Sequence, residues 1–147
     1  MSYELDPESE FRRELEEKTQ SMPKLLKHLP SGVELVTPPY QGQNCETYAL
    51  GTSGIRNVLS GLYADISNPQ EGDIVLYHSE ENGVVHVGIY QKDGTVMSKW
   101  GNMGPVLRHP VDHVPSSYGD TVMFRRIPKK DLEDMRGKDV FDFISFP

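Results

Sequence analysis

Two residues in this chain could together carry nucleophilic chemistry: its single cysteine and a histidine in a predicted strand. Cys45 follows Asn44, a residue type favoured immediately before a helix, so we expect Cys45 to begin a helix. Backbone N–H groups and the helix dipole favour a thiolate there, and the thiolate is the nucleophilic form. The same N–H groups can stabilise an oxyanion. The expected chemistry is attack of sulfur on a carbonyl carbon.

His86 is the residue that could act as the base. Val85, Val87 and Ile89 share one face of the predicted strand, so His86 lies on the other face. From there its imidazole could take the thiol proton and return it to a leaving group. Gly88, two residues on, would leave room above the sheet for a substrate or a facing helix. Each residue alone has an ordinary interpretation, as a small buried thiol or as a hydrogen-bonded, half-buried histidine.

The elements that must position this pair can be read from hydrophobic spacing and turn signals. Asp6 is the expected N-cap of a helix over residues 6–20, and a second short helix ends before Pro30. Predicted strands cover residues 33–36, 73–78, 84–91, 95–100, 106–109 and 121–127. Tight turns make sequential strands antiparallel. The predicted fold class is therefore α+β, with N-terminal helices packed on an antiparallel meander sheet.

Length, charge and cysteine content exclude several classes of protein. The 147 residues fit one domain, and one cysteine allows no intramolecular disulfide. A formal net charge of −7 argues against nucleic acid and anionic membranes as partners. No apolar run is long enough to cross a bilayer, and the polar start lacks the features of a secretory signal. We expect a cytoplasmic protein, with specialised export or release by lysis left open.

Three segments in order resemble the NlpC/P60 superfamily: EGDIVLY at 71–77, HVGIY at 86–90, and the Asp-Gly turn at 93–94. Members of that family carry their catalytic cysteine upstream at the start of a helix, as at Cys45. The resemblance covers roughly residues 43–126. It implies a papain-like domain over 31–129, with a helical extension over 1–30 and an aromatic tail over 130–147.

The resemblance also implies an activity. Cys45 would be the nucleophile and His86 the base of a bacterial or phage cysteine hydrolase, an amidase or endopeptidase of the thiol protease kind. Its substrate would be a peptide or amide, including peptidoglycan peptides, and no metal or organic cofactor is implied. One alternative is a toxin or effector that deamidates, cleaves or acylates a protein. Another is a non-catalytic interaction domain on the same fold.

The third catalytic residue is where this sequence departs from the family pattern. The family usually has a histidine about twelve residues after the base, whereas this chain has Ser98. A hydroxyl can accept the imidazole N–H but stabilises an imidazolium less, and His109 is a rival for this role. Ser98 would lie on the same side of the sheet as His86 only if residues 92–94 form a three-residue loop with Gly94 in a left-handed conformation.

Other polar and aromatic residues leave alternatives open. Gln41 or Gln43 could donate to an oxyanion or be a surface glutamine, and Trp100 could line a groove or pack in the core. The spacing of His109 and His113 is that of half a zinc site, but the single cysteine and Pro110 between the two histidines argue against one. The tail residues Phe141, Phe143 and Phe146 are expected to be covered by the domain or by a protein partner.

Overall fold

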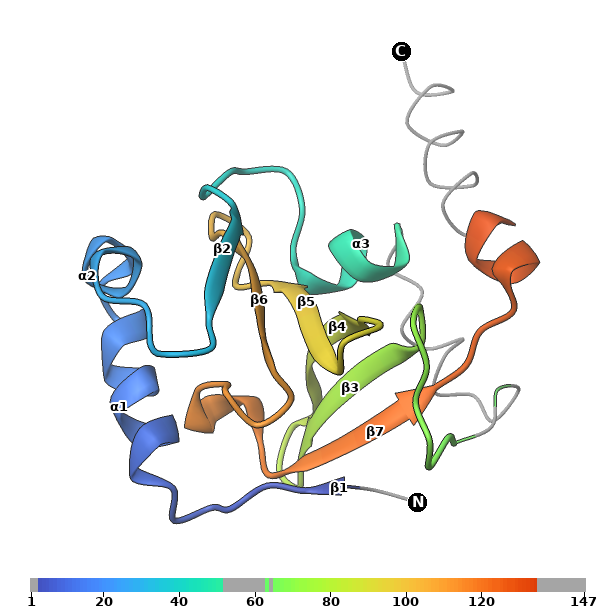
Figure 1. Cartoon of the computed structure of the whole chain (residues 1–147), viewed down its shortest axis with the longest axis horizontal. Helices are drawn as coiled ribbons and strands as arrows, with labels where there is room; N and C mark the ends of the chain where they lie inside the picture. Colours follow the sequence, from blue (N-terminus) through green and yellow to red (C-terminus); the bar gives the residue numbers. More distant parts are fainter. Residues whose placement is uncertain (1–2, 52–62, 64, 135–147) are drawn as a thin grey trace.

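A computed structural model describes residues 3–51, 63 and 65–134 of the chain. The helices are α1 (Glu10–Thr19), α2 (Met22–Lys27), α3 (Cys45–Leu50) and the short 3₁₀ helix η1 (Ser116–Tyr118). The strands are β1 (Tyr3–Glu4), β2 (Glu34–Thr37), β3 (Ile74–Ser79), β4 (Gly83–Tyr90), β5 (Thr95–Lys99), β6 (Val106–Pro110) and β7 (Thr121–Arg125). The fold class is α+β, as predicted: α1 and α2 stand at one end of an antiparallel sheet, and α3 packs against β4 and β5 (Figure 1).

The sheet is a meander only in its central part. Its strand order is β1-β7-β3-β4-β5-β6-β2, so β3 to β6 follow one another as expected. The last strand does not continue beside β6. It crosses back to pair with β3, where Tyr77 lies between His86 on one side and Val122 on the other. Residues 111–120 make this crossing, and they place η1 against β3 and β4.

Helix α1 begins later than predicted. The structure places the N-cap at Ser9, whose side chain accepts a hydrogen bond from the backbone N–H of Arg12. The expected N-cap, Asp6, instead accepts a hydrogen bond of 2.9 Å from the backbone N–H of Glu8. Because this local turn uses the carboxylate, the helix starts after it. The prediction of Asp6 as N-cap was wrong.

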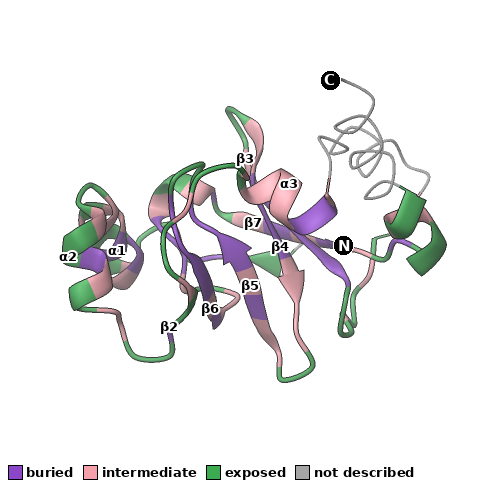
Figure 2. Ribbon diagram, turned by 90° about the horizontal axis from the view of Figure 1, so that it is seen from above, coloured by how far each residue is buried: buried purple, intermediate pink, exposed green. Residues whose placement is uncertain are grey.

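The core consists of two clusters on the two faces of the sheet, because alternating residues of β3 enter different clusters. Figure 2 shows buried residues along the strands of the sheet. Val75 and Tyr77 belong to the first, and Ile74 and Leu76 to the second. The N-terminal segment joins the first cluster through Leu5, Leu15 and Leu25. Residues 1–30 therefore share a core with the sheet through their described part.

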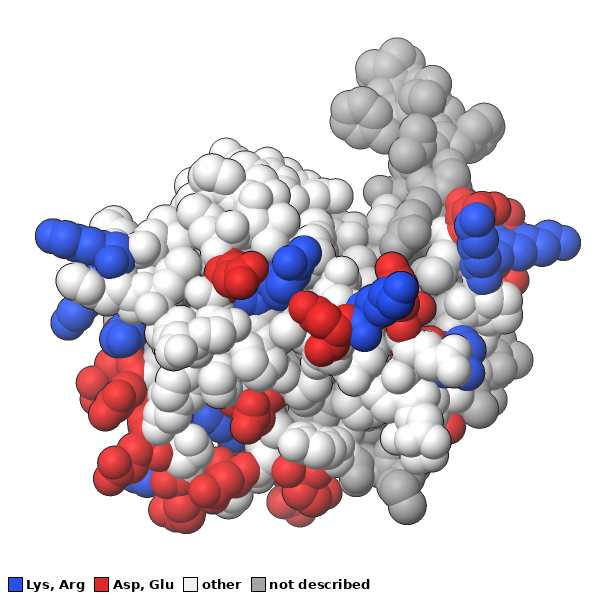
Figure 3. All heavy atoms as spheres, viewed as in Figure 1, with Lys and Arg blue, Asp and Glu red and all other residues white. Residues whose placement is uncertain are grey.

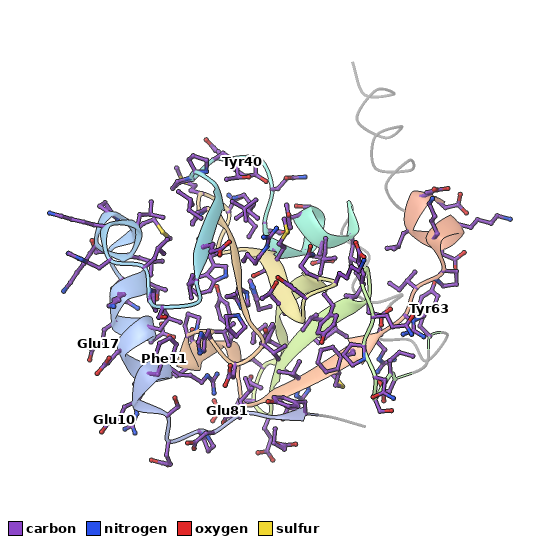
Figure 4. All side chains as sticks on the ribbon, viewed as in Figure 1. Glu10, Phe11, Glu17, Tyr40, Tyr63 and Glu81 are labelled. Carbon is purple, nitrogen blue, oxygen red and sulfur yellow. The ribbon has the colours of Figure 1, made fainter. Side chains whose placement is uncertain are left out.

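The outer face of α1 is strongly acidic. Acidic side chains gather over this end of the molecule (Figure 3), and Glu10 and Glu17 point away from the sheet while Phe11 points towards it (Figure 4). None of the helices in the described ranges is long and apolar enough to span a membrane.

Candidate functional site

Cys45 is the first residue of α3, as the sequence predicts. Asn44 is the N-cap: its side-chain oxygen accepts from the backbone N–H of Thr47 at 2.8 Å, and the Thr47 hydroxyl accepts from the backbone N–H of Asn44 at 2.9 Å. This reciprocal pair fixes where the helix begins. At the other end, Gly51 closes the described helix with a positive φ of 78°. The cysteine is thus held at a defined first turn.

Cys45 and His86 line the same small pocket, of 180 Å³. The pocket is formed by the start of α3 and by the first half of β4: Asn44, Cys45, Glu46, Val84, Val85, His86 and Val87. A β-bulge lies at Val85, because His86 pairs with Tyr77 while Val84 pairs with His78. Bulges of this kind redirect side chains next to functional sites. No hydrogen bond joins the Cys45 sulfur to the His86 ring in the described part of the chain.

The electrostatics of Cys45 differ from the sequence-based expectation. Burial raises the pKa of its thiol above the ordinary 9.0, and the nearby Glu46 carboxylate raises the pKa further. Backbone hydrogen bonds from Val87, Glu46 and Cys45 itself lower the pKa, as expected for a helix start, but burial outweighs them. The expectation of a lowered thiol pKa was therefore wrong, and the sulfur carries its proton at neutral pH.

His86 is buried in a set of aromatic rings. It is only 2% exposed, and burial together with His109 holds its pKa well below 6.5. Its ring stacks on that of Tyr118, with centroids 4.0 Å apart and planes at 22°, and the ring of Tyr77 lies 5.5 Å away. Its Nε2 has no hydrogen-bond partner. The pair of Cys45 and His86 is thus neutral.

The turn between β4 and β5 has the longer form that Ser98 required. The backbone N–H of Gln91 donates to the carbonyl of Thr95 at 2.7 Å, and Gly94 has a φ of +88°. In this register Ile89 pairs with Met97, so Ser98 follows opposite Gly88. The predicted three-residue loop is confirmed.

Ser98 nevertheless does not hydrogen-bond to His86. Its hydroxyl is 2.9 Å from Nε2 of His109 and accepts from the indole N–H of Trp100 at 3.0 Å. Ser98 lies opposite Gly88, two residues along β4 from His86, and its hydroxyl is used by His109 and Trp100. Trp100 itself is buried in the first core cluster.

Gly88 has a different use from the one expected. A Cβ at this position would lie 2.5 Å from Cγ1 of Val96 and 3.2 Å from the Met97 carbonyl oxygen. Glycine is thus needed for β4 and β5 to approach closely, and the space beside it holds β5 rather than a substrate.

The Gly-Asp segment before β3 has a structural role. Asp73 is buried, and its two carboxylate oxygens accept from Nε and Nη2 of Arg126, both at 2.9 Å. One of them also accepts from the backbone N–H of Gln70 at 2.7 Å. The aspartate therefore joins the turn before β3 to the chain leaving β7.

The remaining candidate residues that the structure describes do not line the pocket that Cys45 and His86 share. The side-chain oxygen of Gln43 accepts from the hydroxyl of Tyr40, which lies on the connection between β2 and α3 (Figure 4). Gln41 is exposed. His113 packs on Phe11 with ring centroids 4.4 Å apart. The described residues contain no group of three or more metal-binding side chains. The expected cover of Phe141, Phe143 and Phe146 lies outside the described residues.

Tyr118 is the site residue that the sequence did not indicate. It stacks on His86, and its pKa is raised by burial and by the negative charges that Cys45 and Glu16 carry when ionised. No local pattern pointed to it, because it lies in a crossover whose destination depends on strand pairing. The sequence offered only a tyrosine followed by Gly119, shortly before the predicted strand that begins at residue 121.

The comparisons with known proteins add a family but no activity. No curated protein matches the chain significantly, and no solved structure does. A family model described as "Domain of unknown function (DUF7689)" matches residues 52–126. This segment contains His86, Ser98 and Tyr118 but begins after Cys45. Since it spans just over half of the chain, the protein belongs to the DUF7689 family.

Proposed function

We propose that this chain is a cysteine hydrolase, an amidase or endopeptidase, with a papain-like domain of the NlpC/P60 type. The observation that carries the proposal is the shared pocket: Cys45 begins a capped helix, and His86 lines the same cavity from β4. A helix that starts at the cysteine and packs against an antiparallel sheet supports the same assignment. The expected substrate is a peptide or amide, including peptidoglycan peptides.

The mechanism starts from a neutral pair. As the sulfur attacks the carbonyl carbon, the thiol proton passes to His86, so thiolate and imidazolium form only during attack. Backbone N–H groups at the start of α3 can face the developing oxyanion. Collapse of the tetrahedral intermediate breaks the C–N bond, and His86 returns the proton to the leaving amine. Water then hydrolyses the thioester and restores the thiol.

The test is cleavage of soluble peptidoglycan fragments and of a peptide mixture by the full chain, followed by mass spectrometry. Products with a new carboxylate and a new amine should appear with the natural sequence. They should be lost in Cys45→Ala and His86→Gln. His28→Gln, at an exposed position, is the matched control and should retain cleavage. Equal product yields from Cys45→Ala and the natural chain would overturn the proposal.

A non-catalytic interaction domain is the second candidate, and a specific observation favours it. Cys45 and His86 are both neutral and share no hydrogen bond, while Ser98 is engaged by His109. In that case alkylation of Cys45 would proceed at the same rate in His86→Gln as in the natural chain. A slower rate in His86→Gln would favour the hydrolase.

A further inference from the structure

The His86 ring is oriented without a hydrogen bond at Nε2. Histidines that act as bases are usually held by a polar partner on the second ring nitrogen. Here Ser98, the expected partner, bonds to His109 and Trp100. What confines the His86 ring is instead a pair of tyrosines, with Tyr118 stacked at 4.0 Å and Tyr77 tilted at 5.5 Å.

Tyr118 can orient the histidine because its own ring is fixed. Trp100 meets it edge-on, with centroids 5.8 Å apart, and Tyr77 lies 6.3 Å away. The stacked planes of Tyr118 and His86 leave the imidazole little freedom to rotate about χ2, since rotation would drive one ring into the other. A flat aromatic contact thus fixes the plane in which both imidazole nitrogens lie.

The loop that carries Tyr118 is held from the N-terminal helix. Arg12 of α1 is 2% exposed, and its guanidinium donates to the carbonyl oxygens of Val114 and Pro115, both at 3.2 Å. It also donates to the carbonyl of Gly119 and, at 3.1 Å, to the carboxylate of Asp120. These partners flank Tyr118 on both sides, so one buried side chain fixes both ends of η1.

We propose that Tyr118 is the positioning residue of His86, taking the place of a polar third residue, and that Arg12 holds Tyr118 in register. The effect of Tyr118 on catalysis rests on the proposed hydrolase function. Its restriction of the His86 ring does not depend on that function. The N-terminal helix is then part of the site, because Arg12 holds the loop whose tyrosine stacks on the imidazole.

The direct test is the mobility of the His86 ring, measured by ¹³C relaxation at Cδ2 in histidine-labelled protein, with the signal assigned by His86→Gln. In the natural chain and in Tyr118→Phe, which keeps the aromatic plane, the ring should be as rigid as the backbone, with an order parameter of about 0.85. Tyr118→Leu should lower the value below about 0.6, as in flexible groups. A rigid ring in a folded Tyr118→Leu protein would overturn the inference.

A second variant keeps Tyr118 and loosens its loop. Arg12→Met removes the guanidinium but keeps a long apolar stem, and it should also raise the mobility of the His86 ring. Arg13→Met is the matched control, because Arg13 is exposed and its guanidinium contacts Glu8, through a hydrogen bond of 2.7 Å to the carbonyl oxygen and an ion pair of 3.8 Å with the carboxylate. If Tyr118→Leu does not fold, Arg12→Met decides the question: a His86 ring as rigid as in Arg13→Met would contradict the inference.

Alkylation of Cys45 separates this inference from the proposed function. If both hold, Tyr118→Leu should slow iodoacetamide labelling to the rate of His86→Gln, whereas Tyr118→Phe should not. If the ring becomes mobile but labelling is unchanged in both Tyr118→Leu and His86→Gln, Tyr118 positions His86 and the hydrolase proposal fails.

Discussion

At the sulfur of Cys45 two physical effects oppose each other. The N–H groups around it stabilise the thiolate, and burial beside Glu46 disfavours it. Burial is the larger effect, so the thiol stays protonated. His86 is neutral for the same reason. Under the proposed hydrolase function, the thiolate would therefore form only during attack on the substrate.

The first prediction concerns the pH dependence of Cys45 alkylation. Because its pKa is raised above 9.0, labelling by iodoacetamide at pH 7 should be slower than that of an unstructured cysteine peptide. The thiolate fraction drops about tenfold for each unit of pKa increase. The labelling rate, followed by intact-mass spectrometry, should rise with pH and reach half of its maximum above pH 9.0. Cys45→Ser is the blank, and labelling faster than the peptide would contradict the expectation.

The second prediction concerns Gly88. In Gly88→Ala the new Cβ would lie 2.5 Å from Cγ1 of Val96, so β5 must shift. We expect a loss of about 1–3 kcal/mol in the free energy of unfolding, measured with urea. In Val96→Ala the clashing methyl is absent. The double variant should therefore be more stable than the sum of the two single effects predicts, and strict additivity would argue against the clash.

At the scale of elements, α3 and the η1 crossover position the site in different ways. The start of α3 depends on four consecutive residues, Asn44 to Thr47, and their reciprocal hydrogen bonds. The position of η1 depends on Arg12, more than a hundred residues away along the chain. The first is a local property of the sequence, and the second is a property of the packed molecule.

The third prediction tests the N-cap of α3. Asn44→Ala removes the side-chain acceptor for the backbone N–H of Thr47, and we expect a loss of about 1 kcal/mol in the free energy of unfolding. Asn44→Asp keeps an acceptor of the same shape and should retain stability. The measurement is urea unfolding followed by circular dichroism. Equal losses in both variants would show that the cap does not determine the start of α3.

At the scale of the whole molecule, the returning β7 strand shares one core with the described part of the N-terminal segment. Leu5 and Leu15 from the N-terminal segment pack with Val122 and Phe124 from β7. The same cluster takes in Tyr77 and borders His86, so the stability of the fold is coupled to buried histidines.

The fourth prediction is acid sensitivity. Burial lowers the pKa of His109 from 6.5 to about 4 and holds that of His86 well below 6.5. The unfolded chain therefore binds more protons than the folded one once the pH falls below 6.5. The free energy of unfolding should decrease as the pH falls. For His109 alone the loss at pH 5 is about 2 kcal/mol relative to pH 7.

Urea unfolding between pH 7 and pH 5 checks this, since this range lies above the ordinary pKa values of carboxyl groups. The matched control is His28→Gln, at an exposed position, which should lose stability in the same way as the natural chain. A free energy of unfolding that stays constant over this range would show that the buried histidines do not govern acid stability.

Short-range patterns in the sequence were sufficient for much of this protein. The N-cap at Asn44, the start of α3 at Cys45 and the left-handed Gly94 each depend on a few consecutive residues, whose hydrogen bonding and allowed backbone angles are local. The α+β class followed for the same reason, because hydrophobic alternation and turn residues define strands without reference to their partners.

Only the tertiary structure decided which of these elements meet. The return of β7 to β3 and the clamp of Arg12 on the η1 loop arise from packing between distant segments, which no local pattern encodes. Burial is likewise a property of the whole fold, and for that reason the direction of the Cys45 pKa could not be read from its place at a helix start. The stacking of Tyr118 on His86 depends on both, because the crossover delivers the ring and the core buries it.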